Sequence, residues 1–203
     1  MRKWILATGN VGKVRELETA LAGLDLEILP QSALAVPEVA ETGLTFVENA
    51  LIKARNAARH GGLPALADDS GLVVDALDGA PGIYSARYAG PGADDRANID
   101  KLLAALAGVS AARRTARFVC ALALLRHPAD PMPLLCQASW EGVVLAEPRG
   151  AGGFGYDPVF FVPDQKRTAA ELAPAEKNRL SHRGQALALL RQQLRVDGAL
   201  AGL

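Results

Sequence analysis

Residues 2–17 read RKWILATGNVGKVREL, which is an apolar run, a short turn with two glycines, and then a stretch with regularly spaced apolar residues. The apolar run, KWILAT at residues 3–8, predicts a buried strand. The residues that recur with helical spacing after the turn are Val14, Leu17, Leu21 and Leu24. A strand that passes through a tight turn into a helix is the building unit of α/β proteins, so this stretch predicts that fold class.

The turn itself, TGNVGK at residues 8–13, places a lysine directly after a glycine at the start of the predicted helix. The nucleotide-binding loop G-x-x-x-x-G-K-[ST] would need glycine in place of Ala7 and serine or threonine in place of Val14. The dinucleotide pattern G-x-G-x-x-G fails as well, because only two glycines are present. Glycines still let backbone N–H groups approach an anion, and Lys13 adds positive charge at a helix N-terminus. We therefore predict a phosphate site of another kind, with an ordinary strand-to-helix turn as the alternative.

The alternation of strands and helices continues along the chain. LEILPQ at residues 26–31 predicts a second strand, and Thr45 followed by Glu48 is the capping-box signature of a helix start. ARFVCALALL at residues 116–125 and PLLCQASWEGVVL at residues 133–145 predict neighbouring strands. The leucines spaced for a last helix are Leu187, Leu190 and Leu194. We expect an α/β protein with a mixed sheet flanked by helices.

Composition and charge argue against several classes of binding partner. The 203 residues suit one domain, which we place at residues 1–203, and half of them are hydrophobic. Lysine plus arginine and aspartate plus glutamate each number 22, so the net charge is zero, which argues against a nucleic-acid partner. The longest apolar stretch, FVCALALL, has eight residues and is too short to cross a membrane, so no membrane partner is expected. Cys120 and Cys136 have no metal-ligand spacing and predict buried reduced thiols in a cytoplasmic protein.

Two adjacent acids follow a hydrophobic stretch in the middle of the chain. LPALADD at residues 63–69 predicts a strand that ends in Asp68 and Asp69, followed by a turn at Ser70 and Gly71 and another strand, LVVDAL. Neighbouring acids are costly to bury without a cation, because like charges raise each other's pKa. Mg²⁺ would offset this cost, since it binds one or two carboxylates together with substrate phosphates. Solvated aspartates in a turn are the alternative.

Two further charged residues lie near the capped helix. Glu41 stands in the loop before it and is a candidate second carboxylate for the metal, with a plain surface glutamate as the alternative. Lys53 lies on a narrow polar stripe of the helix, opposite the apolar face, and a solvated helix face is the alternative. The other residues of this stripe are Asn49, Asn56 and His60.

Two later stretches combine features that suit a nucleotide. GGFGYDP at residues 152–158 places Phe154 and Tyr156 beside glycines, which suits a tight loop presenting a ring to a flat base, with a loop packed on the core as the alternative. The stretch EKNRLSHRG, at residues 176–184, gathers Lys177, His182 and Arg183 before or within the last predicted helix. Alone these would be surface charge. Together with the glycine–lysine turn and the paired acids, they favour a nucleotide site.

Six motifs, taken in order, resemble the inosine triphosphate pyrophosphatase family, and in particular the bacterial dITP/XTP pyrophosphatases of the RdgB type. They are TGNVGK, ETGLTFVENALIKA, ADDSGL, PGIYSARYAG, GGFGYDPVF and EKNRLSHRGQAL. Each motif alone would be a weak signal, but six in order are specific and cover nearly the whole chain. The connection between Val109 and Arg117 carries no motif.

The resemblance implies Mg²⁺-dependent hydrolysis of dITP, ITP, XTP and dXTP to the monophosphate and pyrophosphate, which cleanses the nucleotide pool of abnormal purines. Asp69 matches the proton acceptor that activates water. Glu41 and Asp69 match the acids of the metal site, with Mn²⁺ as the alternative ion. The positions that match substrate contacts are Thr8, Gly9, Asn10, Val11, Gly12, Lys13, Lys53, Ser70, Phe154, Gly155, Tyr156, Asp157, Lys177, His182 and Arg183. Two roles stay open for Asp68, namely support of the metal through water and orientation of the nucleophile.

The resemblance also implies an elongated sheet in two lobes with the site in a central cleft, and a homodimer. We expect Ser181, His182 and Arg183 to select the base, because hypoxanthine and xanthine carry a carbonyl at C6, where adenine carries an amino group. Two rival hypotheses remain. One is a related nucleotide pyrophosphatase of the Maf type with a different base preference. The other is a nucleotide- or nucleic-acid-binding module without catalysis, which the neutral net charge disfavours.

Overall fold

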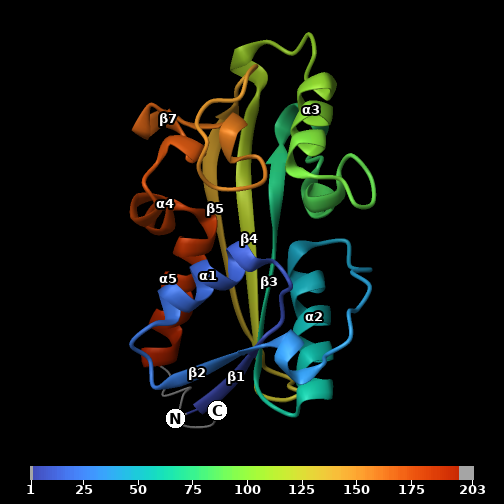
Figure 1. Ribbon diagram of the computed structural model, residues 1–203, viewed down its shortest axis with the longest axis vertical. Helices are drawn as coiled ribbons and strands as arrows, with labels where there is room; N and C mark the ends of the chain where they lie inside the picture. The colour runs from blue at the N-terminus through green and yellow to red at the C-terminus, as the bar shows by residue number, and fades with distance from the viewer. Residues whose placement is uncertain (1, 197–203) are drawn as a thin grey trace. The chain divides into compact units, whose positions relative to one another are not determined.

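The computed structural model describes residues 2–196. Within them, seven strands form one sheet in the order β2-β1-β3-β4-β5-β6-β7, accompanied by helices (Figure 1). The strands are β1 (Arg2–Leu6), β2 (Leu26–Pro30), β3 (Ala65–Val74), β4 (Thr115–Leu125), β5 (Leu134–Val144), β6 (Phe160–Val162) and β7 (Arg167–Thr168). The α-helices are α1 (Val11–Leu21), α2 (Phe46–Gly61), α3 (Asp95–Ala105), α4 (Pro174–Leu180) and α5 (His182–Val196). β1 pairs in parallel with β2 and β3, whereas β6 pairs antiparallel with β5 and β7, so the expected mixed α/β sheet is confirmed.

The chain divides into two compact units. Among the described residues, the first contains residues 2–69, 120–138 and 183–196. The second contains Ser70–Val119 and Ser139–His182. That both units form one pyrophosphatase domain stays a prediction.

The two faces of the sheet in the first unit carry residues of opposite parity, because side chains alternate across a strand. Leu6 of β1 and Leu66 of β3 share a cluster with Leu17 of α1 and Leu187 of α5. Odd-numbered residues of the same strands share a second cluster with α2. Its members in these three elements are Ile5, Ala65, Ala67, Ala50, Ala54, Ala57 and Ala58, and Ala7, directly after β1, joins them. Helices α1 and α5 therefore cover one face of β1 and β3, and α2 covers the other (Figure 1).

Helix α2 begins where the sequence predicts it. The side chain of Thr45 accepts a hydrogen bond from the backbone N of Glu48 at 3.2 Å, and Glu48 Oε2 accepts one from the backbone N of Thr45 at 2.8 Å, so the capping box is confirmed. Such a cap contributes about 0.5–2 kcal/mol. At the other end, a Cβ at Gly61 would lie 2.3 Å from Cδ1 of Ile5, so a side chain there would displace this buried residue of β1. The helix that carries Lys53 is thus fixed at both ends.

Strand β3 corrects one expectation. The predicted turn at Ser70 and Gly71 is wrong, since β3 runs without a break and carries Asp68 and Asp69 in its middle. Aspartate, serine and glycine have low strand propensity, so the local sequence favours a turn. Ion pairs formed with neighbouring elements override that preference. Both acids lie in the interior, Asp68 fully buried and Asp69 6% exposed.

The second unit is built on an aromatic core. Phe118 of β4, Trp140 of β5 and Phe160 of β6 contact one another, with ring centroids between 4.5 and 6.5 Å apart. Ile99 and Leu102 bring α3 into the same cluster. Each aromatic pair adds about 0.5–1.5 kcal/mol beyond the burial of its surface. This core supports the loop that precedes β6.

Two expectations drawn from composition can be compared with residues 2–196. Cys120 and Cys136 are free and buried, as predicted, and burial raises the pKa of the Cys136 thiol to about 11. No helix in this part of the chain combines the length and the apolar character needed to cross a bilayer.

Candidate functional site

The TGNVGK turn connects β1 to α1 in the first unit. Asn10 caps the helix, because its side-chain oxygen accepts a hydrogen bond from the backbone N of Lys13 at 3.1 Å. Thr8 Oγ1 accepts one from the backbone N of Asn10 at 3.2 Å. Val11 and Gly12 begin the helix, and the side chain of Val11 lies outside the described atoms. These bonds fix the first turn of the helix, and N–H groups at helix N-termini are suited to bind anions.

Gly9 gives this turn room for a ligand. A Cβ at Gly9 would meet no protein atom within 4 Å, so protein packing does not require glycine there. The absence of a side chain instead lets a ligand approach the backbone N–H groups closely.

Asp68 is the centre of a buried charge cluster in the first unit. Its Oδ1 lies 3.0 Å from Nζ of Lys13, and its Oδ2 accepts hydrogen bonds from Nε and Nη2 of Arg183 at 3.3 Å each. Nη1 of Arg183 donates to Oε2 of Glu16. Sγ of Cys120 lies 3.9 Å from Oδ2 of Asp68. Since the Asp68 side chain is 0% exposed and that of Arg183 is 3% exposed, these ion pairs are shielded from solvent.

The surrounding cations keep Asp68 ionised. Burial alone would raise its pKa, but Lys13 and Arg183 outweigh burial and hold the pKa of this carboxyl well below its usual range. Burial also acts against the charge of Arg183, but Asp68 and Glu16, together with Cys120, outweigh it, so the pKa of the guanidinium is raised. Asp68 is therefore a fixed negative charge and a poor proton acceptor.

Asp69 belongs to a different cluster, on the opposite face of β3. Its Oδ1 accepts a hydrogen bond from Nζ of Lys53 at 2.8 Å, and the same ammonium lies 2.9 Å from Oε1 of Glu41. Nδ2 of Asn49 donates to Oδ2 of Asp69 at 3.4 Å. Oδ1 of Asn49 accepts a hydrogen bond from the backbone N of Gly43 at 2.9 Å, which ties the loop before α2 to the helix. The loop, the helix and the strand thus meet around one lysine.

The pKa values of the two neighbouring aspartates are shifted in opposite directions. Burial raises the pKa of Asp69, and the charge of Lys53 offsets this only in part. A carboxylate with a raised pKa binds a proton more readily, which suits a general base. Two carboxyl groups whose surroundings push their pKa values apart have divided roles in many active sites. The opposite pKa shifts therefore favour Asp69, and not Asp68, as the proton acceptor.

The acids around Lys53 suit a hard divalent cation. Glu41 and Asp69 supply the carboxylate oxygens that Mg²⁺ prefers, and two acids with one lysine leave a net charge of −1. The Asp68 cluster pairs two acids with two basic residues and is neutral. Within residues 2–196, no three Asp, Glu, His or Cys side chains are grouped closely enough to bind a metal by themselves. An ion here would rest on two carboxylates together with phosphate oxygens of a substrate.

In the second unit, Asp157 shapes the loop at residues 154–157, called the FGYD loop below. Its carboxylate accepts hydrogen bonds from the backbone N of Phe154 at 2.9 Å and from Nζ of Lys177. Gly153 has a φ of 76°, and a Cβ there would lie 2.0 Å from Oδ2 of Asp157, so the loop requires glycine at this position. The ammonium of Lys177 lies 4.8 Å from the ring centre of Phe154, a cation–π contact.

The two rings of this loop have different surroundings. Tyr156 is 4% exposed and donates its hydroxyl hydrogen bond to the backbone O of Ser85 at 2.8 Å, so this ring belongs to the core. Phe154 is only half-buried. Between them, the N–H of Gly155 donates to Oδ2 of Asp95 at 2.7 Å, which anchors the loop to α3. Of the two rings, Phe154 is the more accessible.

His182 and Arg183, both expected to read the base, fall in different units. His182 is 7% exposed, and its ring stacks on Phe118 with centroids 4.9 Å apart. Ser70, another expected substrate contact, is half-buried in β3 and belongs to the second unit, as His182 does. Arg183 lies in the first unit, bound to Asp68 as described above. That these residues select the base stays a prediction.

The sequence did not single out two residues of these clusters. Asn49 was expected on an outer stripe of α2, but it is fully buried against Asp69, and Lys53 is 16% exposed, so the solvated-face interpretation is wrong for both. Glu16 is not among the site residues expected from the sequence. The signal that could have found them is helical spacing, because Asn49 lies four residues before Lys53, and Glu16 lies three residues after Lys13.

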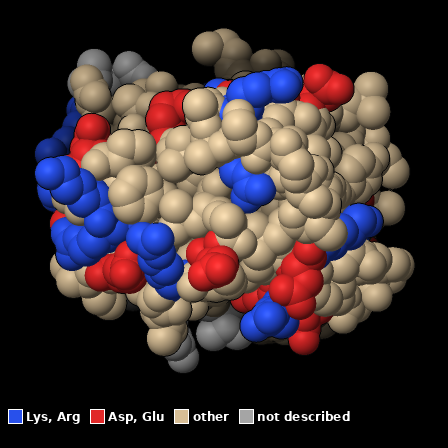
Figure 2. Space-filling view, turned by 90° about the horizontal axis from the view of Figure 1, so that it is seen from above, with Lys and Arg blue, Asp and Glu red and all other residues tan. Residues whose placement is uncertain are grey.

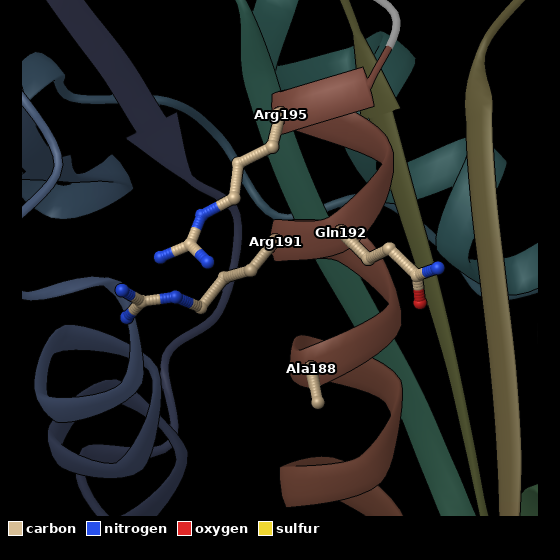
Figure 3. A pocket seen from close by; sticks show the side chains of 4 residues that line it. All are labelled: Ala188, Arg191, Gln192 and Arg195. Carbon is tan, nitrogen blue, oxygen red and sulfur yellow. The ribbon is translucent and has the colours of Figure 1, made fainter.

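An open pocket of about 340 Å³ lies along α5 in the first unit (Figure 3). It is lined by Ala188, Arg191, Gln192 and Arg195. Arg191 and Arg195 extend to the same side of the helix, and Nη1 of Arg191 donates to the backbone O of Ala22 at 3.3 Å. None of these lining residues belongs to the site expected from the sequence.

Known proteins resemble this chain over nearly its whole length. The sequence pattern of the Ham1 family matches residues 4–193. The dITP/XTP pyrophosphatase of Thioalkalivibrio sulfidiphilus is 62% identical over 192 residues, which cover 95% of this chain and 98% of the relative. The dITP/XTP pyrophosphatase of Vibrio parahaemolyticus is 59% identical over 199 residues, 98% of this chain and 100% of the relative.

A solved structure is similar as well. The HAM1 protein from Coxiella burnetii matches with a TM-score of 0.91 at 52% identity, covering 96% of this chain and 99% of that protein. The resemblance read from the motifs is therefore confirmed, and the chain belongs to the Ham1 family.

Proposed function

We propose that this chain is a nucleoside triphosphate pyrophosphatase that hydrolyses dITP and XTP, with ITP and dXTP, to the monophosphate and pyrophosphate. The observation that carries the proposal is the division between two adjacent aspartates. Asp69, whose pKa is raised, lies beside Lys53 and Glu41, whereas Asp68 holds Lys13 at the phosphate loop. The relatives at 62% and 59% identity are dITP/XTP pyrophosphatases, which supports the same substrates here. Such an activity removes abnormal purines before they enter DNA or RNA.

Hydrolysis at the α-phosphorus needs a deprotonated water and neutralisation of phosphate charge. Asp69 accepts a proton from water while the water oxygen bonds to the α-phosphorus. The bond between that phosphorus and the oxygen bridging to the β-phosphorus breaks, and pyrophosphate leaves with this oxygen. Lys13 and Lys53 bring positive charge to the triphosphate, and the backbone N–H groups at the start of α1 add hydrogen-bond donors.

Glu41 and Asp69 are the residues that would hold Mg²⁺, with Mn²⁺ as the alternative ion. The oxygen donors and the net negative charge of their cluster support this assignment. When bound, the ion would withdraw charge from the phosphate oxygens.

For the base, Phe154 is the residue proposed to stack on the purine, an interaction of about 1–3 kcal/mol. The other contacts that the resemblance implies around the base and sugar are Ser70, Gly155, Tyr156, Asp157, Lys177, His182 and Arg183. Donors at C6 would leave the amino group of adenine unpaired, which can reject an analogue by about 10⁴-fold.

The protein is proposed to act in the cytoplasm as a homodimer, without a nucleic-acid or membrane partner. The net charge of zero supports the absence of a nucleic-acid partner. Figure 2 shows Lys and Arg interspersed with Asp and Glu on the face that it displays, without a large basic area.

Release of pyrophosphate from ITP, XTP, GTP and ATP, with and without magnesium, tests the proposal. We expect pyrophosphate and monophosphate as products, with kcat/KM higher for ITP and XTP than for ATP. A Maf-type enzyme would instead prefer other nucleotides. A binding module would bind ITP without releasing any product, and release of orthophosphate alone would contradict the proposed bond cleavage.

A further inference from the structure

The Asp68 cluster contains one residue to which the proposed reaction gives no role. Glu16 lies on α1, one helical turn after Lys13, and its side chain is only 17% exposed. It accepts a hydrogen bond from Nη1 of Arg183, whose Nε and Nη2 donate to Asp68. Asp68 in turn offers its other oxygen to Lys13.

These contacts form a chain of alternating charges, in the order Glu16, Arg183, Asp68 and Lys13. The guanidinium in the middle is 3% exposed, and a buried charge that loses a partner is strongly destabilised. Because a guanidinium is planar and its donors form a rigid fork, two carboxylates bound at different edges fix its plane. The position of Asp68 therefore depends on a carboxylate that Asp68 does not touch.

We propose that Glu16 is a positioning residue for triphosphate binding: it fixes Arg183, Arg183 fixes Asp68, and Asp68 holds the ammonium of Lys13 at the phosphate loop. The inference rests on the proposed function, since it assumes that Lys13 meets a phosphate. A free lysine side chain has many rotamers and loses much conformational entropy when it is held in one of them. An ammonium that is already held in place loses less of that entropy when phosphate binds.

This role predicts which measurements change and which do not. The charge chain acts at the phosphate end of the substrate. Its loss therefore weakens the binding of every ligand that carries a triphosphate by the same factor. A purely structural role would lower the unfolding temperature without changing the affinity of the folded protein. A role in base selection would change the ratio of kcat/KM for ITP and ATP.

The experiment measures binding of inorganic tripolyphosphate by calorimetry, at fixed magnesium and without magnesium, to the full chain and to Glu16→Gln. We expect about tenfold weaker binding, within the range of coupling found in ion-pair networks, and a ratio of kcat/KM for ITP and ATP that stays within about twofold of the parent. Glu18→Gln is the matched control, because Glu18 is an exposed residue of the same helix, and it should bind like the parent.

A double-mutant cycle shows whether the effect passes through Lys13. In a Lys13→Ala background, Glu16→Gln should weaken tripolyphosphate binding by less than about twofold further. Binding within twofold of the parent in Glu16→Gln, or independent losses that multiply in the double variant, would overturn the proposal. If Glu16→Gln does not fold, Glu16→Asp, which keeps the charge, is measured in the same cycle with the same criteria. A parent that binds tripolyphosphate but does not hydrolyse ITP contradicts the proposed function and leaves the positioning role to be judged by the binding data.

Discussion

Asp68 and Asp69 are neighbours on one strand, yet they lie in two different electrostatic surroundings. Asp68 points to the face covered by α1 and α5, where two basic groups lower its pKa. Asp69 points to the face covered by α2, where burial raises its pKa and one lysine is shared with Glu41. Alternation along the strand thus sends two adjacent aspartates to opposite faces of the sheet. Their different surroundings there shift their pKa values in opposite directions. One carboxylate is held ionised by neighbouring cations, and the other binds a proton more readily.

Asp69→Asn is expected to have the largest effect on activity. Loss of a general base alone reduces the rate by about 10²–10⁴-fold, and loss of a metal ligand adds to this. The fold should remain intact, because the amide has nearly the same shape as the carboxyl group. Initial rates of pyrophosphate release from ITP at saturating magnesium, with circular dichroism as the folding control, measure both effects. Activity within tenfold of the parent would show that the division between the two aspartates is wrong.

Asp68→Asn is expected to act first on stability. The substitution leaves the buried Arg183 and the half-buried Lys13 without the charge of Asp68, and breaking a buried ion pair in this way costs about 3–5 kcal/mol. The free energy of unfolding in urea, compared with that of Asp69→Asn, measures the contrast. Equal losses in the two variants would mean that the two clusters do not differ in the way described here.

Lys13→Ala and Lys53→Ala compare the two clusters through their lysines. Lys13→Ala should weaken binding of ITP by about 10–150-fold, which corresponds to one charged hydrogen bond of about 1.5–3 kcal/mol, and should leave binding of inosine unchanged. Lys53→Ala should lower kcat as well, because Lys53 contacts the proposed base Asp69. Lys3→Ala is the control, since Lys3 pairs with Glu27 at the surface. An unchanged KM and kcat in Lys13→Ala would mean that the TGNVGK turn is an ordinary structural turn and does not bind phosphate.

The pH dependence of stability should give the smallest but most specific contrast. Asp68 has a lowered pKa in the folded state, so its stabilisation is present above the ordinary aspartate pKa of about 3.9 and is lost as the pH falls through the folded value. Asp69 has a raised pKa in the folded state. Its favourable contribution to the free energy of unfolding is therefore present below the ordinary aspartate pKa of about 3.9 and is lost as the pH rises through the pKa of the folded state.

In a chelating buffer, Asp69→Asn should therefore stabilise the protein at neutral pH, and this gain should vanish in acid. Asp68→Asn should destabilise it at neutral pH, with a deficit that shrinks in acid. Unfolding free energies at a series of pH values test both signs. Changes in unfolding free energy of the same sign in the two variants would contradict the opposite pKa shifts of Asp68 and Asp69.

Much of the fold could be predicted because its signals are local. The apolar run before TGNVGK, the capping box of Thr45 and Glu48 and the alternation of apolar residues each depend on positions a few residues apart, and the structure confirms them. The predicted turn at Ser70 failed for the same reason, since a local pattern of polar residues and glycine was weighed without the partners that stabilise it. Had β3 been recognised as continuous, alternation alone would have placed the two aspartates on opposite faces.

The sequence by itself determined which chemical groups are available, namely paired acids, two lysines, a glycine-rich turn and a basic cluster near the last helix. Only the tertiary structure decided how these charges are paired. Arg183 reaches Asp68 across 115 positions of the chain, and Asn49 is buried against an acid 20 positions away. The physical reason is that ion pairing and burial depend on which elements pack together in space, whereas spacing in the sequence encodes only neighbours on the same helix or strand.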